Sequence, residues 1–320
     1  MLTGDATLTR EQCIFINVVV PLSYIMNLSV IIPAHGKEDL LIRCLKSLDK
    51  DTQGDSEYEV FVVDDGSGLD EYAVRTQTKA QYPITWHAFE MTRGRSAARN
   101  TGIRATTGEI IVFLDSDMEA REGFIRAHLK HHLEHRHTAV IGNIIWPKGG
   151  SFLKYIGSRG VAKLNTGDDV PPWYFVTGNA SLERADLPEG STFDETLPGW
   201  GGEDLDLGLK LHSAGVKFLF APEAVSYHNF KGDLPGHINR TEFYGKTVLP
   251  ILVKRHPELK KILRLDLMDS LFWRMAVNNI FYLPLKYTVR ILDAIPLPAR
   301  FFDYLTFASY ARGWLKVRQS

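Results

Sequence analysis

Two acidic clusters far apart in the sequence carry the side chains best suited to chemistry. An Asp-Ser-Asp turn at 115–117 follows the apolar run 110–114, and a Glu-Asp pair at 203–204 opens a helical pattern. Carboxylates on a tight turn at a strand end are suitable ligands for Mg²⁺ or Mn²⁺ and for the phosphates that such an ion binds. A second pair at a helix start can supply a general base for a hydroxyl nucleophile. Together they indicate chemistry on a nucleotide-activated substrate.

The elements that must hold these clusters can be read from hydrophobic periodicity. Apolar runs alternate with helical patterns, which predicts a parallel sheet covered by helices on both faces. The expected strands are 28–33, 59–63, 84–89 and 110–114, and the expected helices are 38–49, 70–81, 96–106 with Ser96 as N-cap, and 122–135. In open parallel sheets ligands bind beyond the carboxyl ends of the strands, so the site is expected there.

Polar residues follow the expected strands at these ends. Pro33, Ala34 and His35 end the first strand, and Asp64 with Asp65 ends the second. The Asp-Ser-Asp turn ends the fourth strand. Three polar strand ends at one edge of a sheet are harder to explain by chance than any one of them, so we expect these residues to form one rim.

The second half of the chain has weaker patterns. Strand character is expected at 139–146, 173–182, 217–220 and 224–227, whereas the Gly- and Lys-rich stretch 147–171 has the composition of a mobile segment. Beyond about residue 236 the pattern becomes helical and aromatic. We therefore expect a large α/β domain followed by a helical region.

Composition limits the classes of protein. The 320 residues are 44% hydrophobic and carry a net charge of −1, which argues against nucleic-acid binding by overall charge. Cys13 and Cys44 are too few for a disulfide framework or a cysteine zinc site, which fits a reducing cytoplasm. No apolar run reaches the roughly 18 residues of a spanning helix. We expect residues 1–25 to be a dispensable extension before a start at Met26, with a membrane-contacting segment or weak signal sequence as the alternative.

Five short motifs in a fixed order resemble a known family. They are Ile-Ile-Pro at 31–33, Val-Asp-Asp-Gly-Ser at 63–67, Ala-Arg-Asn-Thr-Gly at 98–102, Phe-Leu-Asp-Ser-Asp at 113–117 and Gly-Gly-Glu-Asp at 201–204. Each motif is weak alone, but the ordered set resembles the family 2 glycosyltransferases with the GT-A fold. The resemblance covers about residues 27–232. The stretch 199–204 is also similar to the β-1,4-galactosyltransferase type.

The resemblance implies a fold and an activity. The fold would be α/β of GT-A type, a Rossmann-like, mostly parallel sheet flanked by helices with a helical C-terminal extension. The expected units are an N-terminal extension at 1–26, a catalytic domain at 27–235 and a helical, aromatic and basic region at 236–320. The activity would be metal-dependent, inverting transfer of a sugar from a nucleoside diphosphate sugar, above all a UDP-sugar, to an acceptor hydroxyl. The cofactor would be Mn²⁺ or Mg²⁺.

Several alternatives remain open beside this activity. The acceptor could be a polysaccharide, a lipid-linked glycan, a peptide or a small natural product. A protein of another class would bind the nucleotide sugar without turnover, although retention of both acidic clusters argues against it. Nucleotidyl transfer lacks support, because no Gly-rich phosphate loop follows the first strand.

The resemblance also assigns the donor site. Asp64 would accept a hydrogen bond from the nucleotide base with Asp65 nearby, and ordinary turn chemistry is the alternative for both. Arg95 and Arg99 at a helix N-terminus would bind the diphosphate, and pairing with carboxylates such as Glu90 is the alternative. The other residues expected on the donor are Pro33, Ala34, His35, Asp115, Ser116, Asn179, Trp200 and Gly202.

The metal and the base fall in the two acidic clusters. Asp117 is implied as a metal ligand, with His228 as a further ligand, and Asp115 would contact the ribose or a metal-bound water. Asp204 would take the proton from the acceptor hydroxyl in a single displacement. Glu203 would position the acceptor or shift the pKa of Asp204 through its like charge. Favourable first-turn helix charges are the alternative for this pair.

Five histidines crowd the predicted helix at 122–135 and the residues after it. They are His128, His131, His132, His135 and His137. Their spacing suggests a metal site, but they stand among charged residues such as Lys130 and Glu134. A solvated helix face is therefore the favoured interpretation.

The C-terminal region is basic and rich in aromatic residues. Residues 254–320 hold twelve Lys or Arg and five Asp or Glu, a charge of 12 − 5 = +7. Aromatic and basic side chains together suit helices that lie on an anionic membrane leaflet, here the inner face. A helical subdomain packed on the catalytic domain, or on a second copy in a homodimer, is an equally good interpretation.

Overall fold

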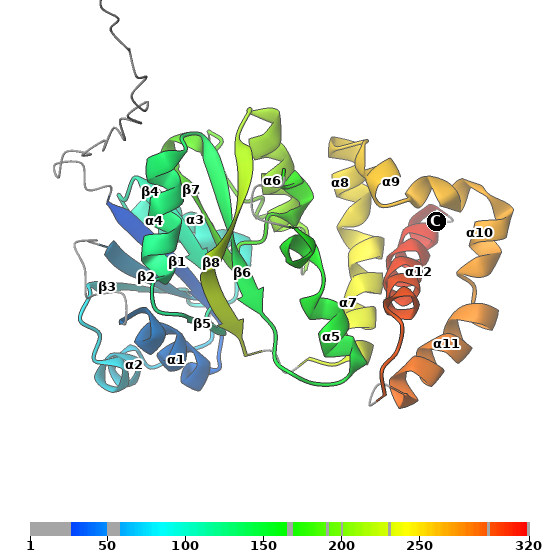
Figure 1. Cartoon of the computed structure of the whole chain (residues 1–320), viewed down its shortest axis with the longest axis horizontal. Coiled ribbons are helices and arrows are strands. Elements are labelled where there is room, and N and C mark those ends of the chain that lie inside the picture. Colours follow the sequence, from blue (N-terminus) through cyan, green and yellow to red (C-terminus); the bar gives the residue numbers. More distant parts are fainter. Residues whose placement is uncertain are drawn as a thin grey trace, which may run out of the picture.

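The computed structural model describes residues 27–49, 58–164, 169–189, 192–199, 201–229, 232–292 and 295–318. The expected extension at 1–26 and the predicted donor residue Trp200 lie outside the described residues. Within them, one mixed sheet has the strand order β3-β2-β1-β4-β7-β6-β8-β5. Helices cover this sheet, and the C-terminal helices lie to one side of it (Figure 1).

The first four strands form the parallel sheet that the sequence predicts. They are β1 (Leu28–Ala34), β2 (Tyr58–Asp64), β3 (Ile84–Ala88) and β4 (Ile110–Leu114), with β1 paired in parallel to β2 and β4, and β2 to β3. The helices between and after them are α1 (Glu38–Leu48), α2 (Glu71–Thr78), α3 (Arg95–Ala105) and, after the short strand β5 (Met118–Ala120), α4 (Phe124–Glu134). Successive β1 side chains enter different cores, so the strand is apolar throughout: Val30 and Ile32 share one core with α1 and α4, and Ile31 packs beside α3.

Helix α3 begins before the predicted N-cap. It starts at Arg95 with Gly94 as its N-cap, and Gly94 has a φ of 94°. The Asp65 carboxylate accepts hydrogen bonds from the N–H groups of Arg93 and Gly94 at 2.7–3.1 Å. The expectation that Ser96 caps this helix was therefore wrong, because a carboxylate from the end of β2 fixes the turn instead.

The second half of the sheet is mixed rather than parallel. Strand β7 (Asn179–Glu183) lies between β4 and β6 (Thr138–Ile145) and is antiparallel to both. Strand β8 (Lys217–His228) runs parallel to β6 and replaces the two short strands that we expected. It remains one strand past Pro222 because the pairing shifts register between Gly142 and Asn143 of β6.

Two other expectations for this half need correction. We expected a strand at 173–182, but the strand in this region is 179–183. Residues 172–174 form a 3-10 turn instead. The stretch 147–171, expected to be mobile, contains helix α5 (Ser151–Gly157) and a 3-10 helix at 160–163. Helix α5 is ordered because Phe152 and Tyr155, three residues apart, are buried in the core of the C-terminal helices.

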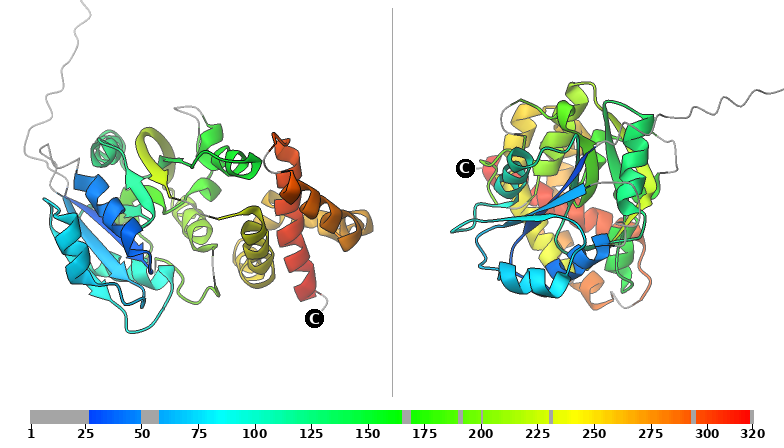
Figure 2. Two further views of the ribbon diagram at one scale, coloured as in Figure 1. Left: turned by 90° about the horizontal axis from the view of Figure 1, so that it is seen from below. Right: turned by 90° about the vertical axis from the view of Figure 1, so that its left-hand side faces the viewer.

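The C-terminal helices enclose a core of their own. They are α7 (Leu234–Thr247), α8 (Leu249–Arg255), α9 (Leu259–Ile262), a 3-10 helix at 265–269, α10 (Leu271–Ala276), α11 (Asn279–Ile291) and α12 (Ala299–Arg318). Helices α7 and α12 approach closely at Gly245 and Gly313, where an added Cβ would collide with the backbone of the other helix. Two further views show these helices beside the sheet (Figure 2). The expected boundary at residue 235 falls in the first turn of α7.

Helix α4 has a buried histidine face, which corrects the expectation of a solvated one. His128 and His132 are fully buried, whereas His135 and His137 are exposed. The buried pair lies against β7: His128 Nδ1 and His132 Nε2 each lie 2.8 Å from Ser181 Oγ. Hydrogen-bond partners on the sheet therefore take the place of the water that we expected around these histidines.

Candidate active site

The polar strand ends meet at one rim, as the sequence predicts. A cavity of about 90 Å³ is lined by Pro33, Ala34, His35, Lys37, Asp65, Arg95, Asp115, Ser116 and Asp117. A second cavity of about 490 Å³ shares His35, Lys37, Asp65 and Arg95 with the first. It extends the rim to Glu195, Gly201 and Glu203. The two acidic clusters thus border one continuous cleft.

The two aspartates after β2 have different positions. Both oxygens of Asp64 accept hydrogen bonds from its own turn, from the N–H and the hydroxyl of Ser67 and from the N–H of Leu69. Asp65 lines both cavities and accepts hydrogen bonds from the N–H groups of the two residues that precede α3. The role of Asp64 on the nucleotide base stays a prediction, and Asp65 is the member of the pair that borders the cleft.

Arg99 joins the two acidic clusters. Its guanidinium contacts Asp115 Oδ1 at 2.9 Å, Glu203 Oε1 at 3.2 Å and Asp204 Oδ1 at 3.6 Å, and its side chain is 1% exposed. We call Arg99, Asp115, Glu203 and Asp204 the carboxylate centre. Burial alone would lower the pKa of Arg99, but the three carboxylates raise it, so the guanidinium stays charged. A diphosphate contact for Arg99 stays a prediction, and in this structure its donors are directed to carboxylates.

Burial and charge act differently on the two aspartates of the carboxylate centre. Burial would raise the pKa of Asp115, but Arg99 and then Arg95 outweigh it and lower that pKa. Burial raises the pKa of Asp204 to about 6, helped by the like charge of Glu203 and opposed by Arg99 and by a hydrogen bond from Thr177. Asp115 is therefore a fixed anion, whereas Asp204 can take and release a proton near neutral pH.

The start of α6 (Glu203–Ser213) positions Asp204. Its N-cap Gly202 has a φ of 96°, and an added Cβ there would meet Val248 Cγ1 at 2.7 Å. Because Gly202 has no Cβ, the start of α6 can pack against the start of α8. The first turn of α6 then faces Arg99. The Thr177 hydroxyl donates to Asp204 Oδ1 at 2.6 Å, and the Thr177 N–H lies 3.3 Å from Oδ2. These contacts fix the carboxylate.

Asp117 and His228 are brought together by β5. This strand pairs with the end of β8, with Met118 opposite His228, and the Asn229 N–H donates to the Asp117 carbonyl at 2.8 Å. As a result Asp117 Oδ1 lies 3.9 Å from His228 Nε2. Burial lowers the pKa of His228, against the pull of Asp117 and Asp115, which favours the neutral form that binds metals.

This pair fits a cation that the substrate helps to hold. Within the parts of the chain that the structure describes, no group of three or more His, Cys, Asp or Glu could enclose a metal ion. Mg²⁺ and Mn²⁺ are often bound by one or two protein side chains together with substrate phosphates. One carboxylate and one imidazole at this separation match that donor set. Their role as ligands stays a prediction.

Asn179 lies away from the cleft, although we expected it on the donor side. It is fully buried, its Oδ1 lies 2.9 Å from His128 Nε2, and its Nδ2 donates to Ala224 O and Ser226 Oγ. Asn179 and Ser181 with His128 and His132 form what we call the histidine cluster. Burial lowers the pKa of His128 to about 4 and of His132 to about 3, so both rings are neutral at pH 7.

Two arginines near the start of α3, Arg93 before the helix and Arg95 as its first residue, line the cleft. Arg95 is exposed and lines both cavities. Arg93 pairs with Glu195 at 3.3 Å and stacks on Phe89. Arg95 is therefore the cation of this set best placed to meet a diphosphate.

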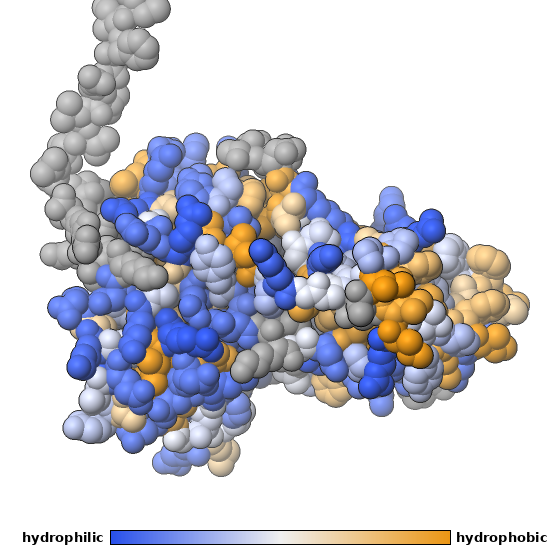
Figure 3. Space-filling view, turned by 60° about the horizontal axis from the view of Figure 1, so that its bottom comes forward, coloured by the Kyte–Doolittle hydropathy of each residue, from blue (hydrophilic) through white to orange (hydrophobic). Residues whose placement is uncertain are grey.

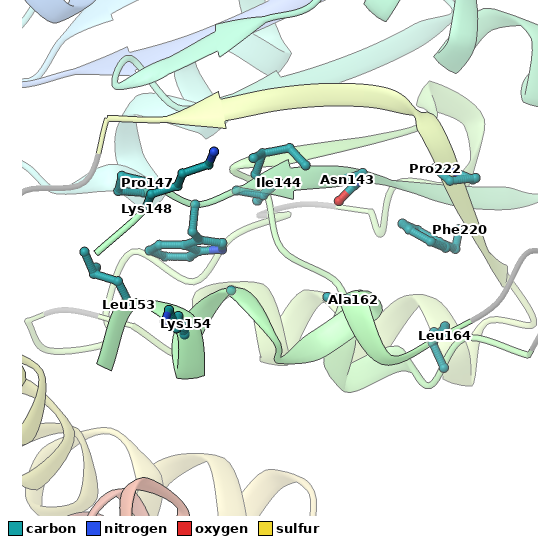
Figure 4. A pocket seen from close by; sticks show the side chains of 13 residues that line it. Asn143, Ile144, Pro147, Lys148, Leu153, Lys154, Ala162, Leu164, Phe220 and Pro222 are labelled. Atoms are coloured by element: carbon teal, nitrogen blue, oxygen red, sulfur yellow. The ribbon is translucent and has the colours of Figure 1, made fainter. Parts of the chain in front are cut away.

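A third, mainly apolar groove of about 490 Å³ lies beyond His228. Figure 4 shows Ile144 on β6 and Phe220 and Pro222 on β8 along one side of it, with Leu153 on α5, Ala162 and Leu164 along the other. Lys148 and Lys154 also line this groove. Trp146 belongs to the groove, and its ring stacks on His228 with 4.6 Å between the centroids. The groove therefore reaches the imidazole that lies 3.9 Å from Asp117, a residue of the first cavity.

Sequence reasoning missed three residues of this site. Lys37 has a left-handed φ of 53° and places Nζ 4.0 Å from Asp117 Oδ2. Its position two residues after His35 at the first strand end was the available signal. Thr177 and Trp146 were visible as parts of predicted strands, but only the fold shows their contacts with Asp204 and His228.

The chain matches a family model and curated relatives. The model for glycosyl transferase family 2 matches residues 29–187, about half of the chain. The glycosyltransferase YfnE of Bacillus subtilis (strain 168) is 29% identical over 255 residues, which cover 63% of this chain and 64% of that protein. The chain spans between 48% and 66% of the length of the first curated relatives that it matches.

Solved structures share the fold. The mannosyltransferase PcManGT from Pyrobaculum calidifontis, in complex with GDP-Man and Mn²⁺, superposes with a TM-score of 0.61 at 19% identity, covering 92% of this chain and 88% of that one. S. aureus TarS 1-349, in complex with UDP-GlcNAc, has a TM-score of 0.59 at 16% identity and covers 92% of each chain. The predicted α/β fold of GT-A type is confirmed. By motif order, fold and family match, the chain belongs to glycosyl transferase family 2.

Proposed function

We propose that the protein is a metal-dependent, inverting glycosyltransferase that moves a sugar from a nucleoside diphosphate sugar to an acceptor hydroxyl. The observation that carries the proposal is the Arg99 bridge between Asp115 and Asp204. It holds the turn suited to a cation and the group suited to general-base work in one cleft. We further propose that residues 27–235 form the catalytic unit and that 236–320 form a helical appendage.

The donor half of the proposal rests on the rim of the first cavity. Arg95 and Lys37 bring positive charge to a cleft whose other wall is acidic. Asp117 and His228 would hold Mn²⁺ or Mg²⁺, and the cation, when bound, would offset the charge that builds on the departing diphosphate. The presence of UDP-GlcNAc in one structural neighbour and of GDP-Man and Mn²⁺ in another supports a nucleoside diphosphate sugar, and we propose a UDP-sugar.

The chemical step uses this chain's own groups in a single displacement. Asp204 takes the proton of the acceptor hydroxyl while that oxygen bonds to the anomeric carbon, and the bond from this carbon to the diphosphate breaks. An α-linked donor therefore gives a β-linked product. The pKa of Asp204, about 6, makes the carboxylate an effective base at neutral pH. Thr177 and Arg99 orient it, and Glu203 borders the cleft where the acceptor would lie.

The acceptor side is proposed to include the groove behind Trp146. Because Trp146 stacks on His228, a group bound in the groove would lie beside the proposed metal ligand. The apolar walls with Lys148 and Lys154 suit an acceptor that carries both an apolar part and an anionic group. A lipid-linked glycan or a polysaccharide precursor with a phosphate would meet that description.

A donor screen tests the function. Wild-type protein should release a nucleoside diphosphate from one of a panel of UDP- and GDP-sugars with Mn²⁺ and an acceptor mixture, and release should stop in EDTA. Asp204→Asn should keep donor binding by calorimetry while transfer falls by roughly 10²–10⁴, the usual scale for loss of a general base. Asp117→Ala should lose the Mn²⁺ response. Asp266→Asn, at an exposed position remote from the cleft, is the matched control.

The outcomes separate the competing interpretations. Donor binding without release by the wild-type protein would indicate the non-catalytic nucleotide-sugar-binding class. Normal transfer by Asp204→Asn with lost donor binding would give this residue a different role. Full activity of Asp117→Ala in EDTA would remove the metal from the proposal.

A further inference from the structure

Helix α11 has apolar side chains on two opposite sides. Tyr282 and Val289 are each 2% exposed and belong to the core of the C-terminal helices. On the other side, Ile280, Tyr287 and Ile291 recur at helical spacing and are 57–78% exposed. A helix that is apolar all round is normally covered on both sides. One side of α11 has no cover from the described residues.

The exposed side continues onto α10. Leu271 and Phe272 are 72% and 70% exposed, and Phe281 is 58% exposed at the start of α11. We define the α10–α11 face by six residues: Leu271, Phe272, Ile280, Phe281, Tyr287 and Ile291. Hydrophobic surface gathers at this end of the molecule in the space-filling view (Figure 3). Contiguous patches of this kind mark interaction sites, unlike single exposed apolar residues.

The aromatic residues of the C-terminal region are thereby divided into two groups. Phe302 and Trp314 of α12 are 1% and 9% exposed, so they serve the internal core. Phe272 and Phe281 are instead 70% and 58% exposed, so most of each side chain lies outside the internal core. The basic and aromatic composition of 254–320 therefore describes two different structures, and among its described residues the exposed aromatic side chains, Phe272, Phe281 and Tyr287, lie on α10 and α11.

The charges carried by α10 and α11 themselves have one sign. Residues 270–292 contain Arg274, Lys286 and Arg290 and no acidic residue. Two copies of this face meeting through a two-fold axis would bring six cations together without an anion among them, which opposes a homodimer. An apolar surface bordered by cations instead complements the headgroups of anionic lipids above an acyl boundary.

We propose that the α10–α11 face binds the surface of an anionic lipid bilayer. The six apolar side chains would enter the headgroup level, and Arg274, Lys286 and Arg290 would contact lipid phosphates. None of the helices in the described parts of the chain is long and apolar enough to cross a membrane, so the contact would be with one leaflet. Each cation at such a surface strengthens binding about fivefold, a contribution that salt screens, whereas apolar insertion resists salt.

Flotation of the full chain with vesicles tests the proposal. Vesicles of phosphatidylcholine with phosphatidylglycerol should carry the protein at low salt, vesicles of phosphatidylcholine alone should carry much less, and high salt should weaken but not abolish the effect. Phe272→Ser with Phe281→Ser should reduce binding by tenfold or more. Lys286→Glu with Arg290→Glu should reduce it and remove its salt dependence.

Matched variants keep the result interpretable. Tyr72→Ser changes an aromatic residue that is 79% exposed on α2, and should bind vesicles as the wild type does. The substituted positions are exposed, except for the half-buried Lys286, so the thermal melting of each variant is measured beside its vesicle binding and should stay unchanged. The proposal is overturned if anionic vesicles do not carry the wild-type protein, or if the double serine variant binds like the Tyr72→Ser control. It is also overturned if sedimentation shows a wild-type dimer that the serine variant dissociates while vesicle binding is unaltered. Sugar transfer is not part of the readout, so failure here leaves the proposed function standing.

Discussion

The carboxylate centre and the histidine cluster both bury polar side chains, but Arg99 and Asp115 are charged whereas His128 and His132 are neutral. Arg99 stays charged at 1% exposure because carboxylates surround it, and its guanidinium in turn lowers the pKa of Asp115. His128 and His132 have no carboxylate against their rings in the histidine cluster, and burial makes them neutral. The difference teaches that burial alone does not decide ionisation, since the neighbouring charge does.

Loss of the cation should have the largest effect on this comparison. Arg99→Met would leave Asp115, Glu203 and Asp204 facing one another without a counter-charge. We expect the free energy of unfolding to fall by about 3 kcal/mol, because a buried pair that loses one partner is strongly destabilised, and sugar transfer to be lost. Urea denaturation and diphosphate release measure both. Arg104→Met, an exposed position on the same helix, is the control. A stable, active Arg99→Met protein would contradict the charge balance inferred for this centre.

Each buried ring of the histidine cluster should respond to acid by a smaller amount. A histidine whose pKa is lowered by folding contributes stability above its unfolded pKa of about 6.5, and this stability is lost as the pH falls toward the folded pKa. With folded values of about 4 and about 3, each ring should cost about 2 kcal/mol of unfolding free energy between pH 7 and pH 5. Urea denaturation of wild-type protein and of His132→Asn over this range measures the slope.

The variant should be less stable at pH 7 but should have a shallower slope. His135→Gln, at an exposed position after the same helix, should keep the wild-type slope. Equal slopes for wild type and His132→Asn would mean that His132 has the same pKa in the folded and the unfolded protein.

A change at Thr177 should give the smallest effect and would sharpen the role of Asp204. The base must be ionised, so transfer should fall with decreasing pH and reach half its maximum near pH 6. The Thr177 hydroxyl bond lowers the pKa of Asp204, and Thr177→Val should therefore move this midpoint to higher pH by less than about one unit. A pH profile of transfer measures it, with the exposed Thr76→Val as control. A midpoint that moves to lower pH would assign the acidic limb to another group.

The rim of the cleft could be predicted from the sequence because its causes are local. Continuous apolar runs identify β1, β2 and β4, and parallel pairing places their carboxyl ends together. Residues 33–35, Asp65 and 115–117 follow from that geometry, and they line the cleft as expected. The family motifs added roles that periodicity could not supply.

The remaining features depend on pairing between distant segments, which periodicity does not report. The antiparallel insertion of β7 between β4 and β6 puts Asn179 under α4 rather than in the cleft. The sequence suggested that Arg99 binds a diphosphate. Its three carboxylate partners lie on other elements, so their contacts with Arg99 are not visible in the local sequence. Histidines among charged residues look solvated until the sheet supplies hydroxyl and amide partners.

Strand β5 makes the spacing of the proposed metal ligands an all-or-none property. Three residues of backbone pairing, with Met118 opposite His228, set where Asp117 lies relative to that imidazole. A slip of one residue would move the carboxylate by about 3.3 Å and turn its side chain to the opposite face of the sheet. No intermediate spacing is available through this ladder. Substitutions at the buried Met118 and Ala120 would not remove any proposed ligand. They would nevertheless decide whether Asp117 and His228 lie close enough to bind one cation.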